Sequence, residues 1–349
     1  MQMDVDDGDV SGWDENDMDV DDFVGVKHRR SNMISPSVSM MDVDVGRARN
    51  LLTSQWNDIA QASGAAEITI VNEVDDEAIP PIPEGFVYVE SGYTYPPELK
   101  PPEIIDDLFL RCDCASCMDA SSCECQDLVS VMDSLGRKIY AYHKNGFYNF
   151  EYPQGSIVVE CNKFCKCPTN HCRNRVAQKP RDIPIQVFKT LGRGWGVCST
   201  TLIRKGKVLG MYGGTIITRA HAESLDEEAK SYCFDLDGQE MMNEGPTDNS
   251  ESYSVDGRTC GNWTRFLNHS CSPNLQAYQV VYDTIPEMNR PYIAFAALRQ
   301  IDPREELTID YDPAGAIQPT ANRKSKAPSG ATPCRCASKK CRGWVKSIS

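Results

Sequence analysis

Nine closely spaced cysteines constrain the fold of this chain more than any other feature of its sequence. Five lie between residues 112 and 125, and four lie between residues 161 and 172. The chain begins MQMDVDDGDV, which lacks the basic and apolar regions of a secretory signal, so we expect an intracellular protein. Because a reducing compartment disfavours structural disulfides, cysteines at this density indicate metal ligands.

These nine thiolates do not divide into separate four-cysteine zinc sites. They fit three tetrahedral zinc ions, which need twelve ligand positions, if three cysteines bridge two ions each and six bind one ion each. The sequence therefore predicts a three-zinc cluster that holds the fold together and has no catalytic role. Its ligands would be Cys112, Cys114, Cys117, Cys123, Cys125, Cys161, Cys165, Cys167 and Cys172.

The N-terminal region, residues 1–95, differs in composition from the rest. Ten acidic side chains fall within the first 22 positions, and MDVD occurs three times. Low hydrophobicity with clustered like charge cannot offset the entropy of ordering, so we expect this acidic region to be mostly disordered. Residues 27–30 (KHRR) are a weak match to a nuclear import signal. Residues 47–62 have the spacing of a short helix, set by Leu51, Leu52, Trp56 and Ile59.

Short alternating runs from residue 183 onward predict a mainly β domain with few helices. The expected strands are residues 185–189, 207–217, 232–237, 275–282, 292–298 and 306–311. Residues 218–230 are expected to form a helix with Thr218 as its N-cap. No apolar run approaches the length of about eighteen residues that a membrane span needs, so we expect no membrane association.

Four motifs of this domain occur in a distinctive order. They are GWGV at 194–197, YGG at 212–214, RFLNHSC at 265–271 and ELTIDY at 306–311. With these motifs the chain resembles a SET domain. The nine preceding cysteines, which end in CRNRV at 172–176, resemble a pre-SET module, and the C-terminal CRC and CRGW resemble a post-SET module. Together they resemble the Su(var)-type heterochromatin methyltransferases that modify lysine 9 of histone H3, although no chromodomain is recognisable in the N-terminal region.

The resemblance implies a mainly β SET-domain fold of short curved sheets with few helices, flanked by zinc modules. The regions would be a pre-SET zinc cluster at 108–178, a SET catalytic domain at 183–312, a flexible loop at 313–333 and a post-SET zinc module at 334–349.

Three C-terminal cysteines, Cys334, Cys336 and Cys341, are one ligand short of a tetrahedral zinc site. The resemblance implies Cys271 as the fourth ligand, so that a zinc ion would tie the C-terminal segment to the active-site segment. Three unrelated surface thiols are the alternative. The remaining cysteines should be ordinary buried or partly exposed residues; they are Cys198, Cys233 and Cys260.

S-adenosylmethionine is the implied methyl donor. The resemblance assigns it to Asn268, to His269 and to the backbone around Gly194 and Trp195. Three further contacts are implied at Tyr232, Arg265 and Trp344. The last of these could instead simply pack against its neighbours.

The implied reaction is a direct in-line methyl transfer from a sulfonium to an amine, which needs no enzyme nucleophile. Tyr311 should lie beside the reacting amine and Tyr212 should line the same lysine channel, although either could be a core tyrosine. Asp235 and Asp237 could pair with an arginine of the substrate. Two positions depart from the family. Ile309 stands where Phe or Tyr is common, which puts the product in doubt and predicts di- and trimethylation. Cys260 stands where many relatives have Tyr.

The net charge of −14 disfavours binding to phosphate backbones and suits a basic partner, although acidity could also serve only solubility. The implied partners are the histone H3 N-terminal tail and chromatin, in the nucleus and in heterochromatin, with a role in gene silencing. No sequence-specific nucleic-acid binding is expected. Two alternatives remain: a catalytically inactive, zinc-dependent adaptor that binds histones, and a zinc-based nucleic-acid binder, which the charge disfavours.

The expected loop contains TANRKS at 320–325, close to the Thr-Ala-Arg-Lys-Ser target of the H3 tail. One explanation is that a basic linker matches this target sequence by chance. The alternative hypothesis is that Lys324 or Lys326 enters the enzyme's own lysine channel and is methylated there. Tethering would raise the effective concentration of these lysines at the channel.

Overall fold

The computed structural model describes residues 40–101, 109–129, 131–236, 252–284, 290–312 and 331–345. Several sequence-based expectations lie outside these ranges. They are the import signal at 27–30, Asp237, most of the loop at 313–333, and the two lysines Lys324 and Lys326.

Small sheets dominate the fold, as the sequence predicted. A three-stranded sheet has the order β1-β5-β6, and two four-stranded sheets have the orders β3-β8-β10-β9 and β4-β13-β14-β7. Two-stranded pairs join β11 to β2, β12 to β15, and β16 to β17. The strands are β1 (Ile68–Val71), β2 (Val87–Tyr88), β3 (Tyr93–Thr94), β4 (Val158–Val159), β5 (Ile185–Lys189), β6 (Trp195–Ser199), β7 (Val208–Met211), β8 (Gly214–Thr218), β9 (Cys233–Asp235), β10 (Tyr253–Asp256), β11 (Cys260–Gly261), β12 (Asn268–His269), β13 (Leu275–Val281), β14 (Tyr292–Ala297), β15 (Thr308–Ile309), β16 (Thr332–Pro333) and β17 (Trp344–Val345).

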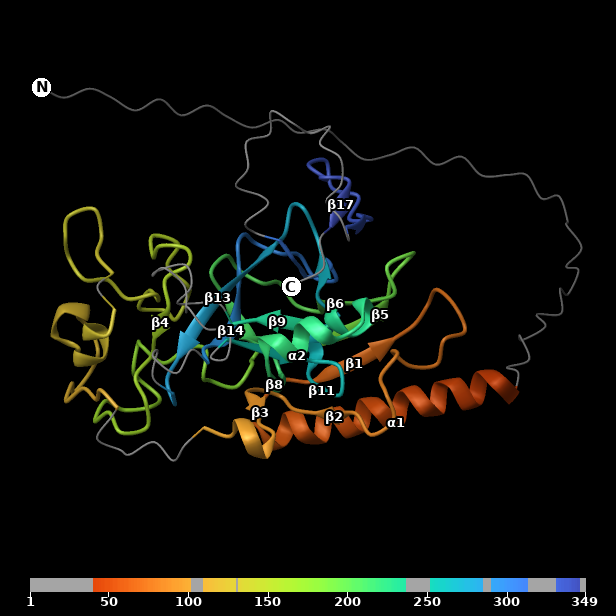
Figure 1. Cartoon of the computed structure of the whole chain (residues 1–349), viewed down its shortest axis with the longest axis horizontal. Coiled ribbons are helices and arrows are strands. Elements are labelled where there is room, and N and C mark those ends of the chain that lie inside the picture. The colour runs from red at the N-terminus through yellow and green to blue at the C-terminus, as the bar shows by residue number, and fades with distance from the viewer. Residues whose placement is uncertain are drawn as a thin grey trace, which may run out of the picture. The chain divides into compact units, whose positions relative to one another are not determined.

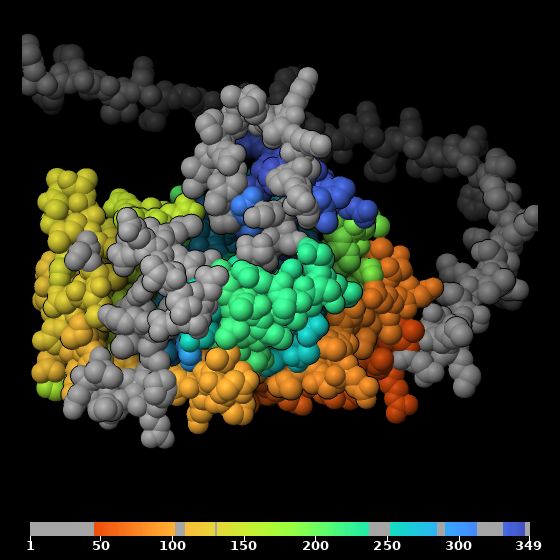
Figure 2. Space-filling view, in the orientation of Figure 1, coloured from red at the N-terminus to blue at the C-terminus, as the bar shows by residue number. Residues whose placement is uncertain are grey.

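Helices are few and mostly short. They are α1 (Met40–Ala62), α2 (Arg219–Ser224), α3 (Glu227–Lys230) and the 3₁₀ turns η1 (Pro97–Leu99), η3 (Ala120–Ser122), η4 (Glu124–Asp127) and η6 (Trp263–Phe266). In Figure 1, α1 runs along one side of the sheets and β17 lies on the opposite side. The cysteine-rich segment forms a lobe at one end, drawn in yellow in Figure 2. No helix among the described residues is long and apolar enough to cross a membrane.

The short helix expected at residues 47–62 is found within α1 (Met40–Ala62), whereas the expectation of disorder is wrong for the rest of residues 40–95. Leu52, Trp56 and Ala60 recur every four residues along α1 and are buried in the main core. Trp56 stacks on Tyr88 with ring centroids 4.8 Å apart. Acidic side chains are concentrated in the first 22 residues, so their composition does not represent the whole of residues 1–95. Two residues used to predict the helix, Leu51 and Ile59, are on its exposed face instead.

The N-terminal segment is also joined to the SET-like sheets through polar contacts. β1 pairs in parallel with β5 over four residues. Arg181 donates to the Glu90 carboxylate at 2.9 Å, and both side chains are almost fully buried. Tyr88 donates its hydroxyl hydrogen to the same carboxylate at 2.8 Å. Because a buried charge is stable only when it is paired and hydrogen-bonded, this cluster requires the segment to stay in place.

The strand predicted at 185–189 is β5 with the same bounds, and the other predicted strands are found with shorter or divided bounds. The run 207–217 is interrupted at Tyr212–Gly213, which separates β7 from β8. The expected helix 218–230 is two helices, because Asp226 accepts from the Ala229 amide at 2.8 Å and starts a new one. Thr218 caps the first by accepting from the His221 amide, as predicted. The sequence did not predict β6, because all five of its residues are buried and no alternation marks it.

Candidate active site and cysteine clusters

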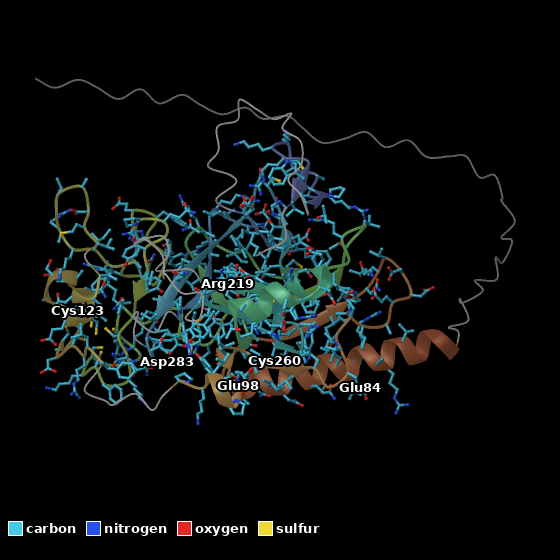
Figure 3. The ribbon with its side chains drawn as sticks, in the orientation of Figure 1. Glu84, Glu98, Cys123, Arg219, Cys260 and Asp283 are labelled. Atoms are coloured by element: carbon cyan, nitrogen blue, oxygen red, sulfur yellow. The ribbon has the colours of Figure 1, made fainter. Side chains whose placement is uncertain are left out.

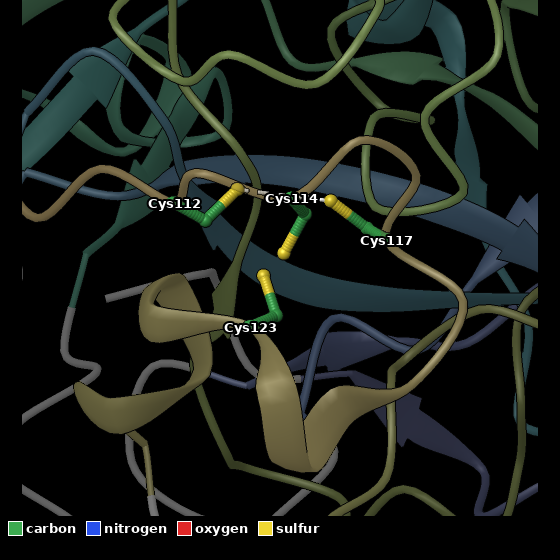
Figure 4. Close-up of side chains that lie close together, drawn as sticks. All are labelled: Cys112, Cys114, Cys117 and Cys123. Atoms are coloured by element: carbon green, nitrogen blue, oxygen red, sulfur yellow. Dashed lines mark hydrogen bonds between the residues drawn. The ribbon is translucent and has the colours of Figure 1, made fainter.

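The nine cysteines between residues 112 and 172 converge in the cysteine-rich lobe. Their sulfurs form three overlapping groups of four, and within each group all sulfurs lie within 4.8 Å of one another. Figure 4 shows one group, in which the side chains of Cys114 and Cys123 point toward each other. The groups are Cys112, Cys114, Cys117 and Cys123; Cys112, Cys117, Cys161 and Cys167; and Cys112, Cys125, Cys161 and Cys165.

The spacing of these sulfurs suits zinc. Tetrahedral Zn–S bonds of about 2.3 Å put neighbouring sulfurs about 3.8 Å apart, whereas a disulfide joins them at about 2.05 Å. The sulfur of Cys117 lies 3.7 Å from that of Cys112 and 3.6 Å from that of Cys161. All sixteen cysteines lie in the described ranges and are free. Cys112, Cys117 and Cys161 each belong to more than one group, which fits sulfurs that bridge two ions.

Cys172 is the one member of the nine that belongs to none of the three groups. It is nevertheless buried in the same cluster. The residues that follow it donate to the cluster sulfurs: Asn174 Nδ2 lies 3.5 Å from Cys161 Sγ and Arg175 Nη2 lies 3.9 Å from Cys167 Sγ. Such donors stabilise thiolates, so the CRNRV motif supplies the second layer of the cysteine cluster.

A second cysteine group joins the C-terminal segment to the strand pair β12–β15. Cys271, Cys334, Cys336 and Cys341 place their sulfurs within 4.8 Å of one another, the combination that the resemblance implied. The backbone amides of Arg342 and Gly343 donate to Cys271 Sγ and Cys341 Sγ, each at 3.3 Å. Four converging thiols with amide donors form a donor set that can hold a zinc ion.

His269 lies between this cysteine group and Tyr311. The Tyr311 amide donates to His269 Nδ1 at 3.2 Å, so Nδ1 acts as an acceptor and the hydrogen of the neutral ring is on Nε2. That Nε2 faces Cys271 Sγ at 3.2 Å. Burial lowers the pKa of His269, although Asp310, 3.6 Å from Nδ1, opposes the shift. The imidazole is therefore neutral at physiological pH.

Asn268 lies close to the GWGV motif. Its Nδ2 donates to the Trp195 carbonyl at 3.1 Å and to Glu306 Oε1 at 2.8 Å. A Cβ at Gly196 would lie only 2.8 Å from both Glu306 Oε1 and Thr190 Cγ2, so any larger residue here would have to displace these side chains. Gly194, with φ of 69°, makes the turn into β6 and accepts from the Thr190 amide. The first and third motifs of the sequence therefore meet at one point.

The two tyrosines predicted for the reaction are held by backbone carbonyls. Tyr311 donates its hydroxyl hydrogen to the Leu267 carbonyl at 2.6 Å, and Tyr212 donates to the Tyr232 carbonyl at 2.7 Å. Burial raises the pKa of both hydroxyls above the ordinary tyrosine value. Tyr311 contributes to the shift at Tyr212, so the two groups are close enough to interact electrostatically. Both remain protonated donors over the physiological range.

Arg265 and Ile309, two other predicted site residues, have neighbours in the same region. The Arg265 guanidinium lies 4.4 Å from the centre of the Tyr232 ring and donates to the Gly257 carbonyl at 3.0 Å. Ile309 is buried in β15, where it pairs with His269. Trp344 is half-buried in β17, which pairs with β16.

Asp235, a predicted contact for a substrate arginine, already has partners for its carboxylate within the chain. Arg219 Nε lies 3.1 Å from it, and the Ser254 hydroxyl donates to it at 2.6 Å. Arg219 is the first residue of α2 and is labelled in Figure 3. A substrate arginine at Asp235 would therefore have to share or displace Arg219.

The three leftover cysteines are buried, and Cys260 lies far from Cys123 of the cluster (Figure 3). Burial raises the pKa of Cys198 to about 11 and that of Cys233 to about 12. Both thiols are therefore protonated at neutral pH and poor metal ligands.

Sequence reasoning missed two arginine contacts of the site. Arg342 Nη2 pairs with Asp310 at 2.5 Å and its Nη1 donates to the Asp312 carbonyl at 3.0 Å, which attaches the C-terminal segment to the end of β15. Arg193 pairs with Glu306. Arg342 and Glu306 stand in the quoted CRGW and ELTIDY motifs, but nothing in the sequence alone shows that charged motif residues pair with one another.

Comparison with known families accounts for this arrangement. The SET domain model matches residues 194–312, and the Pre-SET motif model matches residues 60–175. This chain is a SET-domain protein with a Pre-SET motif. The Pre-SET match begins at residue 60, well before the expected boundary at 108, and so includes the ordered segment that packs on α1.

Curated relatives of this SET-domain chain include the histone-lysine N-methyltransferase, H3 lysine-9 specific, of Schizosaccharomyces pombe, which is 35% identical over 80% of the chain. Human SUV39H2 is 30% identical over 75% of the chain. The chain spans 55% of the length of the first relative and 63% of the second.

Solved SET-domain structures agree with the fold. Neurospora DIM-5, a histone lysine methyltransferase, superposes with a TM-score of 0.59 at 27% identity and covers 78% of this chain and 100% of its own. Arabidopsis thaliana SUVH6 in complex with SAM gives a TM-score of 0.62 at 28% identity, and the match covers 88% of this chain and 59% of the SUVH6 chain. KRYPTONITE, solved with mCHH DNA, H3(1-15) peptide and SAH, gives a TM-score of 0.59 at 27% identity. The match covers 80% of this chain and 51% of the KRYPTONITE chain.

Proposed function

We propose that this SET-domain chain is a lysine methyltransferase that transfers methyl groups from S-adenosylmethionine to lysine 9 of histone H3. One observation carries the proposal: a single imidazole, His269, contacts the Tyr311 amide on one side and the Cys271 sulfur on the other. The SET and Pre-SET matches and the H3 lysine-9 specific relatives support the same activity. We further propose that the protein acts in the nucleus, on heterochromatin, in gene silencing.

In this account zinc has a structural role at two places. The nine cysteines between residues 112 and 172 would hold three ions, and Cys271 with the three C-terminal cysteines would hold one. The sulfur spacing of both groups supports this assignment.

S-adenosylmethionine supplies, when bound, an electrophilic methyl group on a sulfonium. Asn268, His269 and the backbone around Gly194 and Trp195 would bind it, with Tyr232, Arg265 and Trp344 as further contacts. The motif that carries Asn268 meets the GWGV motif through the Trp195 carbonyl, which supports a shared site. SUVH6 and KRYPTONITE were solved with SAM and SAH respectively.

The chain's own residues would act by positioning. Tyr311 and Tyr212 would direct the neutral lysine amine, whose lone pair forms the N–C bond as the C–S bond breaks, and a proton then leaves to water. Because burial keeps both hydroxyls protonated, neither acts as a base. Preorganised dipoles of this kind lower a barrier without an enzyme nucleophile. Ile309 would shape the channel and permit di- and trimethylation.

The proposed substrate is the H3 N-terminal tail. KRYPTONITE was solved with an H3(1-15) peptide and also with DNA, so the expectation of no sequence-specific nucleic-acid binding has no support from that neighbour. Asp235 and Asp237 remain candidates for contact with a substrate arginine, with Arg219 as the internal competitor at Asp235. Automethylation of Lys324 or Lys326 stays a prediction, tested by incubating the protein with cofactor alone and mapping methyl groups by mass spectrometry.

Calorimetric titration with S-adenosylhomocysteine tests the cofactor assignment. We expect binding that Asn268→Ala abolishes, while Asn145→Ala, on the exposed surface of the cysteine-rich lobe, leaves it unchanged. Histone binding without cofactor binding would instead identify an inactive adaptor.

A further inference from the structure

Glu77, which lies in none of the four short SET-like sequence motifs, contacts the indole of Trp195. Trp195 donates from Nε1 to Glu77 Oε2 at 3.1 Å, and the Lys189 ammonium pairs with the same oxygen. Trp195 is 6% exposed, so its N–H needs a protein partner. A carboxylate is a stronger acceptor than a neutral group, so this bond fixes the orientation of the ring.

The loop that carries Glu77 is held by helix α1. Arg49 donates from Nε to the Ala78 carbonyl at 3.0 Å and from Nη2 to the Glu77 carbonyl at 3.2 Å. Asn72 donates to the Glu77 carbonyl at 2.8 Å from within the loop. Arg49 precedes residue 60, where the Pre-SET match begins. The position of Glu77 therefore depends on a helix that starts before both matched domains.

Trp195 connects this loop to Asn268. Its side chain is bonded to Glu77, and its carbonyl accepts from Asn268 Nδ2 at 3.1 Å. Asn268 follows η6 in the chain and belongs to the motif assigned to the cofactor. A change in the orientation of Trp195 would therefore change the position of the Asn268 amide.

We propose that Glu77 is a positioning residue for the cofactor site, which fixes Trp195 and, through it, Asn268, and that α1 contributes through Arg49. The inference rests on the proposed function, because Trp195 and Asn268 are cofactor contacts only in that account. We call the contact between Glu77, Trp195 and Arg49 the indole clamp.

The indole clamp is tested by calorimetry with S-adenosylhomocysteine on the full chain. Glu77→Leu should weaken binding roughly tenfold, because it removes a hydrogen bond to a charged group. Glu77→Gln keeps an oxygen that can accept from the indole and should recover most of the affinity. Asp75→Asn is the matched control, because Asp75 shares the ion pair with Lys189 at 3.3 Å while the indole N–H goes to Glu77. Equal losses in Asp75→Asn and Glu77→Leu would overturn the proposal.

A double-mutant cycle separates the indole clamp from general stability. Trp195→Phe removes the N–H and keeps a ring, so Glu77→Leu should add little further loss in that background. Fully additive losses would overturn the proposal.

A spectroscopic readout tests the clamp without cofactor. The indole N–H resonance of Trp195, identified by its loss in Trp195→Phe, should shift in Glu77→Leu and keep its position in Asp75→Asn. An unchanged resonance in Glu77→Leu would overturn the clamp even if cofactor binds. Absence of cofactor binding in the unaltered protein, with the resonance shifting as expected, would instead overturn the proposed function and leave the clamp as a structural contact only.

Discussion

The backbone amide of Tyr311 donates a hydrogen bond to Nδ1 of His269 across 3.2 Å. The same ring presents Nε2 to the sulfur of Cys271, also at 3.2 Å. One neutral imidazole therefore joins the tyrosine proposed for catalysis to the cysteine group that attaches the C-terminal segment. In this account, metal binding and the position of Tyr311 depend on each other through His269.

Loss of one C-terminal cysteine should separate activity from folding. Cys336→Ser should lower the bound zinc by one ion and abolish methyl transfer, because the C-terminal segment would no longer be held against Cys271. Far-UV circular dichroism should stay near normal, since the β13–β14 and β5–β6 pairings do not involve this cysteine. Zinc content is measured by plasma mass spectrometry, with Cys198→Ala as the control that keeps its metal. Full activity in Cys336→Ser would contradict the metal's role.

The rate of methyl transfer should rise with pH. Only the neutral lysine amine can attack, and a free lysine has a pKa of about 10.4, which burial in an aromatic channel lowers but seldom brings to neutrality. We expect a rise through roughly pH 8–10. Because burial raises the pKa of Tyr311 above its ordinary value, ionisation of that hydroxyl should not cut the rise short in this window. A rate that is flat from about pH 7 would show that deprotonation is not limiting.

The number of methyl groups added should depend on Ile309. This residue is buried in β15 beside His269 and offers no hydroxyl to hold an amine or a water. The unaltered protein should give di- and trimethyl products, and Ile309→Tyr should shift the product toward monomethyl lysine. Mass spectrometry of a histone H3 peptide measures the distribution. Ile309→Val, which also lacks a hydroxyl, is the control, and a mainly monomethyl product from the unaltered chain contradicts the prediction.

Helix α1 should be part of the folded domain rather than a dispensable extension. Trp56→Ala should lower the free energy of unfolding by about 3–5 kcal/mol, because the indole is buried against Tyr88 and Phe266. Leu51→Ala on the same helix should change it by less than about 0.5 kcal/mol, because Leu51 is 60% exposed. Urea denaturation measures both. Similar, small effects of the two substitutions would mean that α1 packs only loosely.

Much of the site could be predicted because its residues stand in contiguous motifs. The site residues between Arg265 and Cys271 belong to one contiguous motif, so they could be predicted together. The number and spacing of the cysteines could be interpreted from metal geometry. Contacts between segments that are far apart in the sequence were harder to predict. Nothing local in the sequence links Arg219 to Asp235 or Arg342 to Asp310, because ion pairing depends on how strands and helices meet in space.

Composition alone led to a wrong expectation of disorder for part of residues 40–95. Residues 40–95 follow an acidic stretch and contain several prolines, yet their apolar residues pack into a core that later strands complete. Leu52 and Trp56 marked a helix in the sequence, but nothing local showed that they and Ala60 would be buried against later strands. Such a segment is ordered by tertiary contacts, which a window of local sequence does not contain.

The most direct test of the central claim is methyl transfer to a histone H3 tail peptide, read by mass spectrometry with isotopically labelled S-adenosylmethionine. We predict label on lysine 9 of the peptide, its loss when that lysine is replaced by arginine, and a fall of at least about a hundredfold with Tyr311→Phe. Absence of transfer by a zinc-replete protein that binds S-adenosylhomocysteine, or label confined to another lysine, would contradict the account.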